Sequence, residues 1–192
     1  VKDVDVDIAV FSNLTPEHLD FHGNIESYFT SKLKLFTGLD SSKTAVINLD
    51  DPYSDKIFSA TSAKVITYGM NETADLHPVQ SSFNLNGTEA KLQYGKKELT
   101  VNTALMGEYN LSNIMAASAV SLNMGISPSH IEQTVNSLPP IPGRLEQISC
   151  NCPGKVFIDY AHTPDAYEKL FSSLTELKDE ENKIIAVFGC GG

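Results

Sequence analysis

The sequence predicts an α/β fold, in which a mostly parallel sheet with helices is joined to an antiparallel meander. Short apolar runs alternate with helical patterns over residues 4–69, as in a parallel sheet with crossover helices. Residues 74–106 instead alternate in polarity and contain Asn-Gly and Gly-Lys turns, which is typical of an antiparallel meander. After the Pro-rich break at 139–143 a strand-helix-strand pattern begins, which indicates the first β-α-β unit of a second α/β domain.

Each element of the first part has a local signal. Strands are expected where apolar runs end in polar or glycine turn residues, at 4–11, 45–51 and 64–69. Helices fit between these strands, at 24–36 and 52–60.

Two more helices are expected after the meander, at 110–125 and 127–138. Ser127 is the predicted N-cap of the second helix, because Pro128 suits the first helical position. The second domain is expected to open with a strand, a helix and a strand at 155–161, 163–178 and 183–189.

Composition indicates a folded cytoplasmic protein. The chain has 192 residues, 41% of them hydrophobic, and a net charge of −10, which argues against a nucleic-acid partner. It contains neither a membrane-spanning apolar run nor a signal peptide. The three cysteines lack paired zinc-type spacing, so we expect free thiols. Because the sequence opens on Val1 and stops at a Gly-rich turn, we expect a fragment of a longer protein.

The helix at 24–36 places a lysine on its apolar face. That face is formed by Ile25, Tyr28, Phe29, Leu33 and Phe36. Lys32 lies on the same face, whereas Lys34 points to the polar side. Two interpretations stay open: the Lys32 stem lies along the apolar stripe with its ammonium in water, or the amine is desolvated. A desolvated amine is a nucleophile that can take up carbon dioxide as a carbamate, an anionic oxygen ligand.

Two histidines precede this helix at a spacing of four. His18 and His22 stand among the carboxylates of Glu17 and Asp20, and the pair could bind one metal from one helical face. The alternative is a capped turn with one packed histidine.

Two asparagines lie near the start of the helix at 110–125. Asn110 is the expected N-cap, and Asn113 follows in the first turn. The Asn113 amide stands beside Ala116 and Ala117 and offers a donor and acceptor edge next to a gap that a flat ring could occupy.

Polar residues also follow the strand at 155–161. Asp159 and His162 stand at its carboxyl end, where open α/β sheets collect ligands. The alternative is that both only satisfy local backbone groups. Arg144 follows a Pro-Gly hinge and suits either a phosphate clamp or an interdomain salt bridge.

Six stretches together resemble motifs of the Mur ligase family, ATP-dependent amide ligases of peptidoglycan precursor synthesis. They are "FSNLTPEHLDFHG" (11–23), the lysine 14 positions after His18, "MGEYNLSNIMAASA" (106–119), "PGRLE" (142–146), "DYAHTPDA" (159–166) and "VFGCGG" (187–192). The resemblance implies a central ATP-binding domain at 1–143 and the start of a Rossmann-like C-terminal domain at 144–192.

The resemblance also implies a set of site residues. Lys32 would be carbamylated and, with His18, would help hold Mg²⁺. The nucleotide-binding residues implied are Asn110 and Asn113 at the adenine, Arg144 and Asp159 at phosphate and ribose, and more loosely His162. Of the two asparagines, Asn113 is the stronger candidate, and His22 would be structural.

The implied reaction uses ATP to phosphorylate the D-glutamyl carboxylate of a UDP-MurNAc dipeptide. The amine of a free amino acid, meso-diaminopimelate or L-lysine, then attacks the acyl phosphate. The family's phosphate loop, G-x-x-x-x-G-K-[ST], occurs nowhere in these 192 residues, so we expect the chain alone to be inactive and to bind ATP weakly.

Three alternatives remain at this stage. One is a related ligase, such as a folylpolyglutamate or cyanophycin synthetase. Another is a metal hydrolase built on His18, His22 and Asp20, which predicts bound zinc and leaves Lys32 and Asn113 without a role. The third is a non-catalytic nucleotide-binding or scaffold module.

Overall fold

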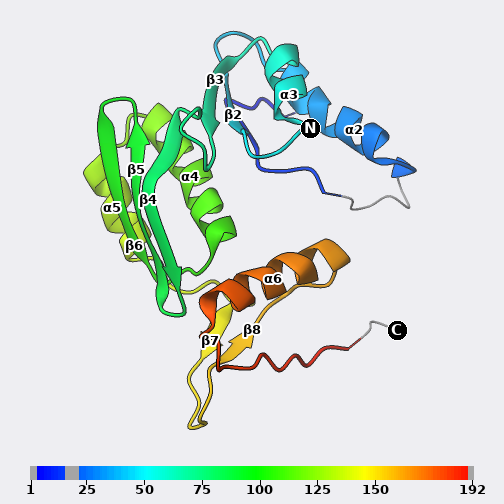
Figure 1. Cartoon of the computed structure of the whole chain (residues 1–192). Coiled ribbons are helices and arrows are strands. Elements are labelled where there is room, and N and C mark those ends of the chain that lie inside the picture. Colours follow the sequence, from blue (N-terminus) through cyan, green and yellow to red (C-terminus); the bar gives the residue numbers. More distant parts are fainter. Residues whose placement is uncertain (1–3, 16–21, 190–192) are drawn as a thin grey trace.

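The fold contains two sheets (Figure 1). The computed structural model describes residues 4–15 and 22–189. A six-stranded sheet has the spatial order β1-β2-β3-β4-β5-β6, and β7 pairs with β8 in a second, two-stranded sheet. The predicted α/β fold, with parallel strands first and a meander after them, is confirmed. None of the helices in the described ranges is long and apolar enough to cross a membrane.

The parallel half of the large sheet is centred on β2. Its elements are β1 (Ile8–Phe11), α2 (Ile25–Thr37), β2 (Thr44–Asn48), α3 (Ser54–Ala60) and β3 (Lys64–Tyr68). Val46 of β2 pairs with β1 on one side and with β3 on the other. Val46 packs into the core on the meander side, whereas Ala45 and Ile47 pack into the core with α2 and α3. Both faces of β2 are therefore buried, which explains its continuous apolar sequence.

The meander continues the sheet beyond the edge where the parallel strands end, because Leu76 at the start of β4 pairs with Tyr68 at the end of β3. Its elements, with the helices that follow, are β4 (Leu76–Asn84), β5 (Gly87–Tyr94), β6 (Lys97–Thr103), α4 (Glu108–Asn123) and α5 (Pro128–Asn136). β4 is parallel to β3, and β5 and β6 are each antiparallel to the strand before them. β6 therefore runs in the same direction as β3. As a result α4 begins at the far end of the meander, on the side of the second sheet (Figure 1).

Helix α5 covers the free edge of β6. The Glu132 carboxylate accepts a hydrogen bond from the Thr100 N–H at 2.5 Å, and the Asn136 side chain accepts one from the Asn102 N–H at 2.7 Å. These side chains satisfy edge donors that would otherwise be open to another strand.

Most predicted helix starts are confirmed. The side chains of Asn24, Ser127 and Thr163 each accept a hydrogen bond from the backbone N–H three residues later, at 2.8, 3.3 and 3.2 Å. The prediction that Asn110 caps α4 is wrong, because the helix begins at Glu108 and Gly107 occupies the N-cap position. Gly107 has φ 87°, a conformation that side-chain-bearing residues avoid.

The second sheet is a short hairpin followed by a helix. Its elements are β7 (Glu146–Ile148), β8 (Val156–Ile158) and α6 (Pro164–Leu177). The predicted strand at 183–189 belongs to neither sheet, and Ile185 and Val187 are 88% and 96% exposed. A strand needs a neighbour for its backbone groups, and no described strand lies beside this segment.

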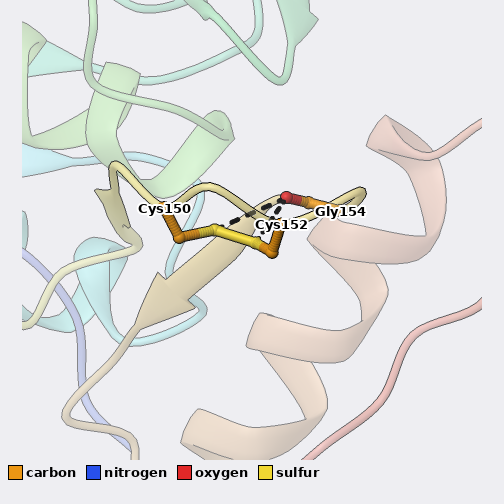
Figure 2. The surroundings of a disulfide bond; sticks show 3 residues. All are labelled: Cys150, Cys152 and Gly154. Carbon is orange, nitrogen blue, oxygen red and sulfur yellow. Dashed lines mark hydrogen bonds between the residues drawn. A yellow bond between two sulfur atoms is a disulfide. The ribbon is translucent and has the colours of Figure 1, made fainter.

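The turn of this hairpin carries a disulfide (Figure 2). Cys150 and Cys152 are bonded, with their Cα atoms 5.4 Å apart. Their sulfur atoms lie 3.9 and 3.3 Å from the Gly154 carbonyl oxygen. The expectation of free thiols is wrong for these two residues, because the turn folds back and brings them together. Cys190 lies outside the described residues.

Candidate active site

Polar side chains at the carboxyl ends of β1 and β2 hold the loop that leaves β1. The Asn48 side-chain amide donates to the Ser12 carbonyl at 2.7 Å. The Asp51 carboxylate, 8% exposed, accepts hydrogen bonds from the Leu14 N–H at 2.7 Å and the Tyr53 N–H at 2.8 Å. This loop leads directly into the segment that contains the predicted metal ligand.

Of the two histidines, only His22 lies among the described residues. His18 lies in the segment 16–21, outside the described residues. His22 stacks on the Tyr28 ring, with the ring centroids 4.8 Å apart. Within the described ranges, no three His, Cys, Asp or Glu side chains are grouped to hold a metal.

Lys32 borders a groove between α2 and β1. The groove has a volume of about 850 Å³, and its wall includes Ser12, Asn13, Lys32, Asp40 and Lys43. The Lys32 side chain is half-buried, and its Nζ lies 4.8 Å from the centroid of the Tyr28 ring, a cation–π contact. The ammonium therefore lies along the apolar face of α2 and also reaches an open groove.

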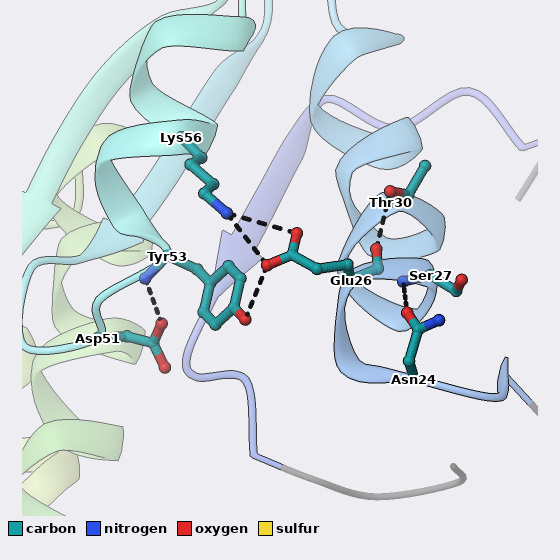
Figure 3. A network of polar contacts seen from close by, with 7 residues as sticks. All are labelled: Asn24, Glu26, Ser27, Thr30, Asp51, Tyr53 and Lys56. Carbon is teal, nitrogen blue, oxygen red and sulfur yellow. Dashed lines mark hydrogen bonds and ion pairs between the residues drawn. The ribbon is translucent and has the colours of Figure 1, made fainter. Parts of the chain in front are cut away.

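A polar network fixes the rotation of α2 against α3 (Figure 3). The Glu26 carboxylate accepts hydrogen bonds from the Tyr53 hydroxyl and the Lys56 ammonium, both at 3.3 Å. Lys32 follows six residues later and is rotated by about 240° around the helix axis. Since Glu26 is tied to α3, Lys32 is directed away from α3 and toward the groove.

The first turns of α4 place the two asparagines differently. Asn110 is 3% exposed, and its Nδ2 donates to the Met106 carbonyl at 2.8 Å. Asn113 is exposed on the following turn. Asn110 thus holds the chain where it enters α4, and Asn113 presents its amide to the surface.

Asp159 locks the turn that precedes β7. Its carboxylate accepts hydrogen bonds from the Leu145 N–H and the Ala161 N–H, both at 2.8 Å. The Tyr160 N–H donates to the Gly143 carbonyl at 2.8 Å, so the turn is held at two points. Leu145 is buried with φ 46°, an uncommon conformation for a residue other than glycine. The Asp159 carboxylate therefore joins the backbone on the two sides of the hairpin.

Arg144 and His162 are exposed on either side of Asp159. One ring nitrogen of His162 lies 2.9 Å from the Tyr160 carbonyl oxygen, and the two rings meet edge to face at 5.0 Å. Both side chains remain accessible to a ligand bound beside Asp159.

Tyr109 lies in the first turn of α4. Burial raises the pKa of the Tyr109 phenol, the Asp159 carboxylate raises it further, and the Arg144 guanidinium lowers it. The phenol is therefore within electrostatic range of both side chains. A contact joins the two sheets, because Lys155 Nζ donates to both residues of the turn 85–86, each at 3.1 Å.

The structure places Asn110 and Asn113 in the first turns of α4, and Arg144, Asp159 and His162 in the turns that flank β7 and β8. The groove beside Lys32 is lined only by residues from 4–13 and 31–43, so it is a separate region of the site. Sequence reasoning missed Asp51 and Tyr109. The Asp-Asp pair directly after an apolar strand was a signal for Asp51, but a tyrosine in an apolar helix start has no such signal.

Two family models match the chain. The Mur ligase middle domain matches residues 1–121, and the Mur ligase glutamate ligase domain matches residues 143–192.

Two similar proteins carry the same name. The UDP-N-acetylmuramoyl-L-alanyl-D-glutamate–2,6-diaminopimelate ligase of Syntrophomonas wolfei is 37% identical and is matched over 100% of this chain and 39% of its own length. The ligase of the same name from Chlamydia caviae is 41% identical, over 100% of this chain and 40% of its own length. The chain therefore spans about two fifths of the length of these relatives.

Solved structures agree with this match. A structure of a ligase of that name has a TM-score of 0.77 at 33% identity and covers 98% of this chain and 39% of its own. MurF from Acinetobacter baumannii has a TM-score of 0.81 at 20% identity, over 90% of this chain and 38% of its own, which supports the fold alone.

Proposed function

Because this chain belongs to the Mur ligase family, we propose that it forms the nucleotide-binding core of an ATP-dependent amide ligase. The relatives are named for joining 2,6-diaminopimelate to UDP-N-acetylmuramoyl-L-alanyl-D-glutamate. We propose the same reaction for the protein in which this chain works, with meso-diaminopimelate or L-lysine as the incoming amino acid. The observation that carries the proposal is the turn held by Asp159, whose carboxylate accepts from the Leu145 and Ala161 N–H groups beside the exposed Arg144 and His162.

The proposed reaction has two steps. The terminal phosphoryl group of ATP is transferred to an oxygen of the D-glutamyl carboxylate, which forms an acyl phosphate and releases ADP. The amino nitrogen of the incoming amino acid then attacks the acyl carbon, loses a proton and displaces phosphate, so that an amide bond forms. Both steps depend mainly on positioning and on neutralising charge, which is the work we assign to this chain.

Nucleotide binding is assigned to the region around α4 and Asp159. Asn113 is the first choice for the adenine, because its amide is exposed and offers a donor and an acceptor together. Asn110 is the second choice, since its Nδ2 already donates to the Met106 carbonyl. Arg144 would neutralise phosphate, Asp159 would accept from the ribose hydroxyls, and His162 would flank the nucleotide.

The Lys32 groove is assigned to the reacting groups. Addition of carbon dioxide to the Lys32 amine, with loss of a proton, would replace a cation by an anionic carbamate. Ser12 and Asn13 line the same groove and offer further oxygen atoms, the ligands that magnesium prefers. Together with His18 these groups suit a Mg²⁺ ion, which would neutralise phosphate charge when bound. An unmodified Lys32 would repel that ion.

The chain also divides into two functional parts. We propose residues 1–143 as the central ATP-binding domain and residues 144–192 as the start of the C-terminal domain. The Pro-Gly turn before Arg144 and the gap between the two family matches support this division. The hinge then lies beside the nucleotide-binding residues.

The carbamate can be observed directly by carbon-13 NMR under labelled bicarbonate at mildly alkaline pH. We expect a carbamate signal that disappears in Lys32→Ala and remains in Lys34→Ala, which removes an exposed lysine two residues away. A signal that survives Lys32→Ala would assign it to another amine. If no signal appears in the full-length protein either, Lys32 keeps its ammonium and the metal assignment is wrong.

The reaction is tested by ADP release in the full-length protein. We expect release only when the UDP-MurNAc dipeptide and one of the two amino acids are both present, and none from the 192-residue chain alone. Release that depends instead on a folate and glutamate would identify the related ligase and refute the proposed substrate.

A further inference from the structure

Tyr109 carries a buried hydroxyl that lacks a hydrogen-bond partner among the described residues. A buried donor of this kind is uncommon, because protein interiors normally satisfy their polar groups. Tyr109 lies in the first turn of α4, between Gly107 and Asn110. The unpaired hydroxyl therefore belongs to the turn that begins the proposed adenine site.

The ring of Tyr109 is held in place. A Cβ atom added at Gly107 would lie 3.0 Å from the ring Cε1, so the backbone there passes directly against the ring. The phenol also lies near the charges of Asp159 and Arg144. The position of its hydroxyl is thus restricted by the Gly107 backbone.

The Asp159 carboxylate can accept one more hydrogen bond. Each of its oxygens already accepts one backbone N–H, from Leu145 and Ala161, and a carboxylate oxygen has a second lone pair. The first turn of α4 thus holds a buried donor without a partner, and the turn at 143–146 is held by an acceptor with free lone pairs.

We propose that Tyr109 is a positioning residue of the nucleotide site, whose hydroxyl donates to the Asp159 carboxylate in the nucleotide-bound state. This inference rests on the proposed function, because it takes Asp159 to be a nucleotide contact. The new hydrogen bond would fix the Asp159 side chain and connect α4 to the turn at 143–146. Nucleotide binding is then favoured by a bond that the free protein does not make.

The test compares Tyr109→Phe with the wild-type full-length protein. We expect about a tenfold weaker Kd for ATP, the effect of losing one hydrogen bond to a charged group. The melting temperature of the free protein should stay the same or rise, because the substitution removes an unpaired buried group. Tyr94→Phe is the matched control, since Tyr94 is also half-buried but lies at the end of the meander opposite to the start of α4. It should change neither quantity.

A double substitution tests the partner. If Tyr109 acts through Asp159, then Tyr109→Phe combined with Asp159→Asn binds ATP no more weakly than Asp159→Asn alone. Additive losses would mean a direct contact with the nucleotide and would overturn the assignment to Asp159. Unchanged ATP affinity in Tyr109→Phe, or a lower melting temperature, would overturn the inference while leaving the proposed function intact. A wild-type protein that binds no ATP would refute the proposed function itself.

Discussion

Replacing Gly107 with alanine should destabilise the start of α4. Gly107 has φ 87° and ψ 158°, a region that only glycine occupies readily. An added Cβ would also lie 3.0 Å from the Tyr109 ring, which is closer than side chains normally approach. Two effects therefore destabilise the variant together: an unfavourable backbone conformation at residue 107 and a steric clash with the Tyr109 ring.

The magnitude follows from comparison with two other glycines. The backbone cost is about 1–3 kcal/mol, and the ring contact places Gly107→Ala at the upper end, about 3 kcal/mol. For a protein of this size that lowers the melting temperature by roughly 6–12 °C. Gly125 has φ 82° with no atom within 4 Å of an added Cβ, so Gly125→Ala should cost about 1 kcal/mol. Gly154 has neither a positive φ nor a close neighbour, and its alanine variant should be neutral.

The assay is thermal unfolding of the wild type and the three variants, followed by circular dichroism. We expect the order Gly154→Ala, Gly125→Ala, Gly107→Ala, from the highest melting temperature to the lowest. If Gly107→Ala has the same melting temperature as Gly154→Ala, the backbone argument is refuted. If it has the same melting temperature as Gly125→Ala, the clash with the Tyr109 ring adds no destabilisation.

Three further predictions concern the supports around the site. Asp51→Ala removes a buried acceptor of two backbone hydrogen bonds and should cost about 3 kcal/mol in chemical unfolding; an unchanged midpoint would contradict this. Glu132→Ala combined with Asn136→Ala should speed amide exchange in β6, and unchanged exchange would show that α5 does not protect this edge. One of the three cysteines should react with a thiol reagent in denaturant and all three after reduction, whereas three without reduction would exclude the disulfide between Cys150 and Cys152.

The elements that could be predicted from sequence are those whose signals are local. The alternation of apolar runs with helical patterns predicted the parallel half, and the turn residues predicted the meander. The segment 183–189 has the same apolar pattern as β2, yet only β2 lies between two strands. Strand formation depends on a neighbour that the pattern itself does not contain. The start of α4 was misplaced by two residues, because a positive φ at Gly107 allows the turn that Asn110 was expected to cap.

The sequence allowed candidate residues of the site to be named, but their burial and contacts could not be predicted from it. The face of Lys32 followed from helical spacing, whereas its half-buried state depends on how β1 and α2 line the groove. Asp159 was expected either to bind a ligand or to satisfy the local backbone. In the structure each of its oxygens accepts one backbone N–H and keeps a second lone pair, so the two roles are compatible.

The topology directs the loops after β1 and β2 and the start of α4 to the same side of the large sheet. Parallel strands all end at the same edge, so the loops after β1 and β2 gather there with Asp51 and the approach to His18. β4 begins at that edge, because Leu76 pairs with Tyr68 at the end of β3, and β6 runs in the same direction as β4. α4 therefore begins beyond that edge and runs back toward β2, where the Asn123 side chain donates to the Thr44 hydroxyl at 3.3 Å. The N-terminus of a 16-residue helix carries unpaired N–H groups and a positive partial charge, which favours a phosphate-bearing ligand at this place.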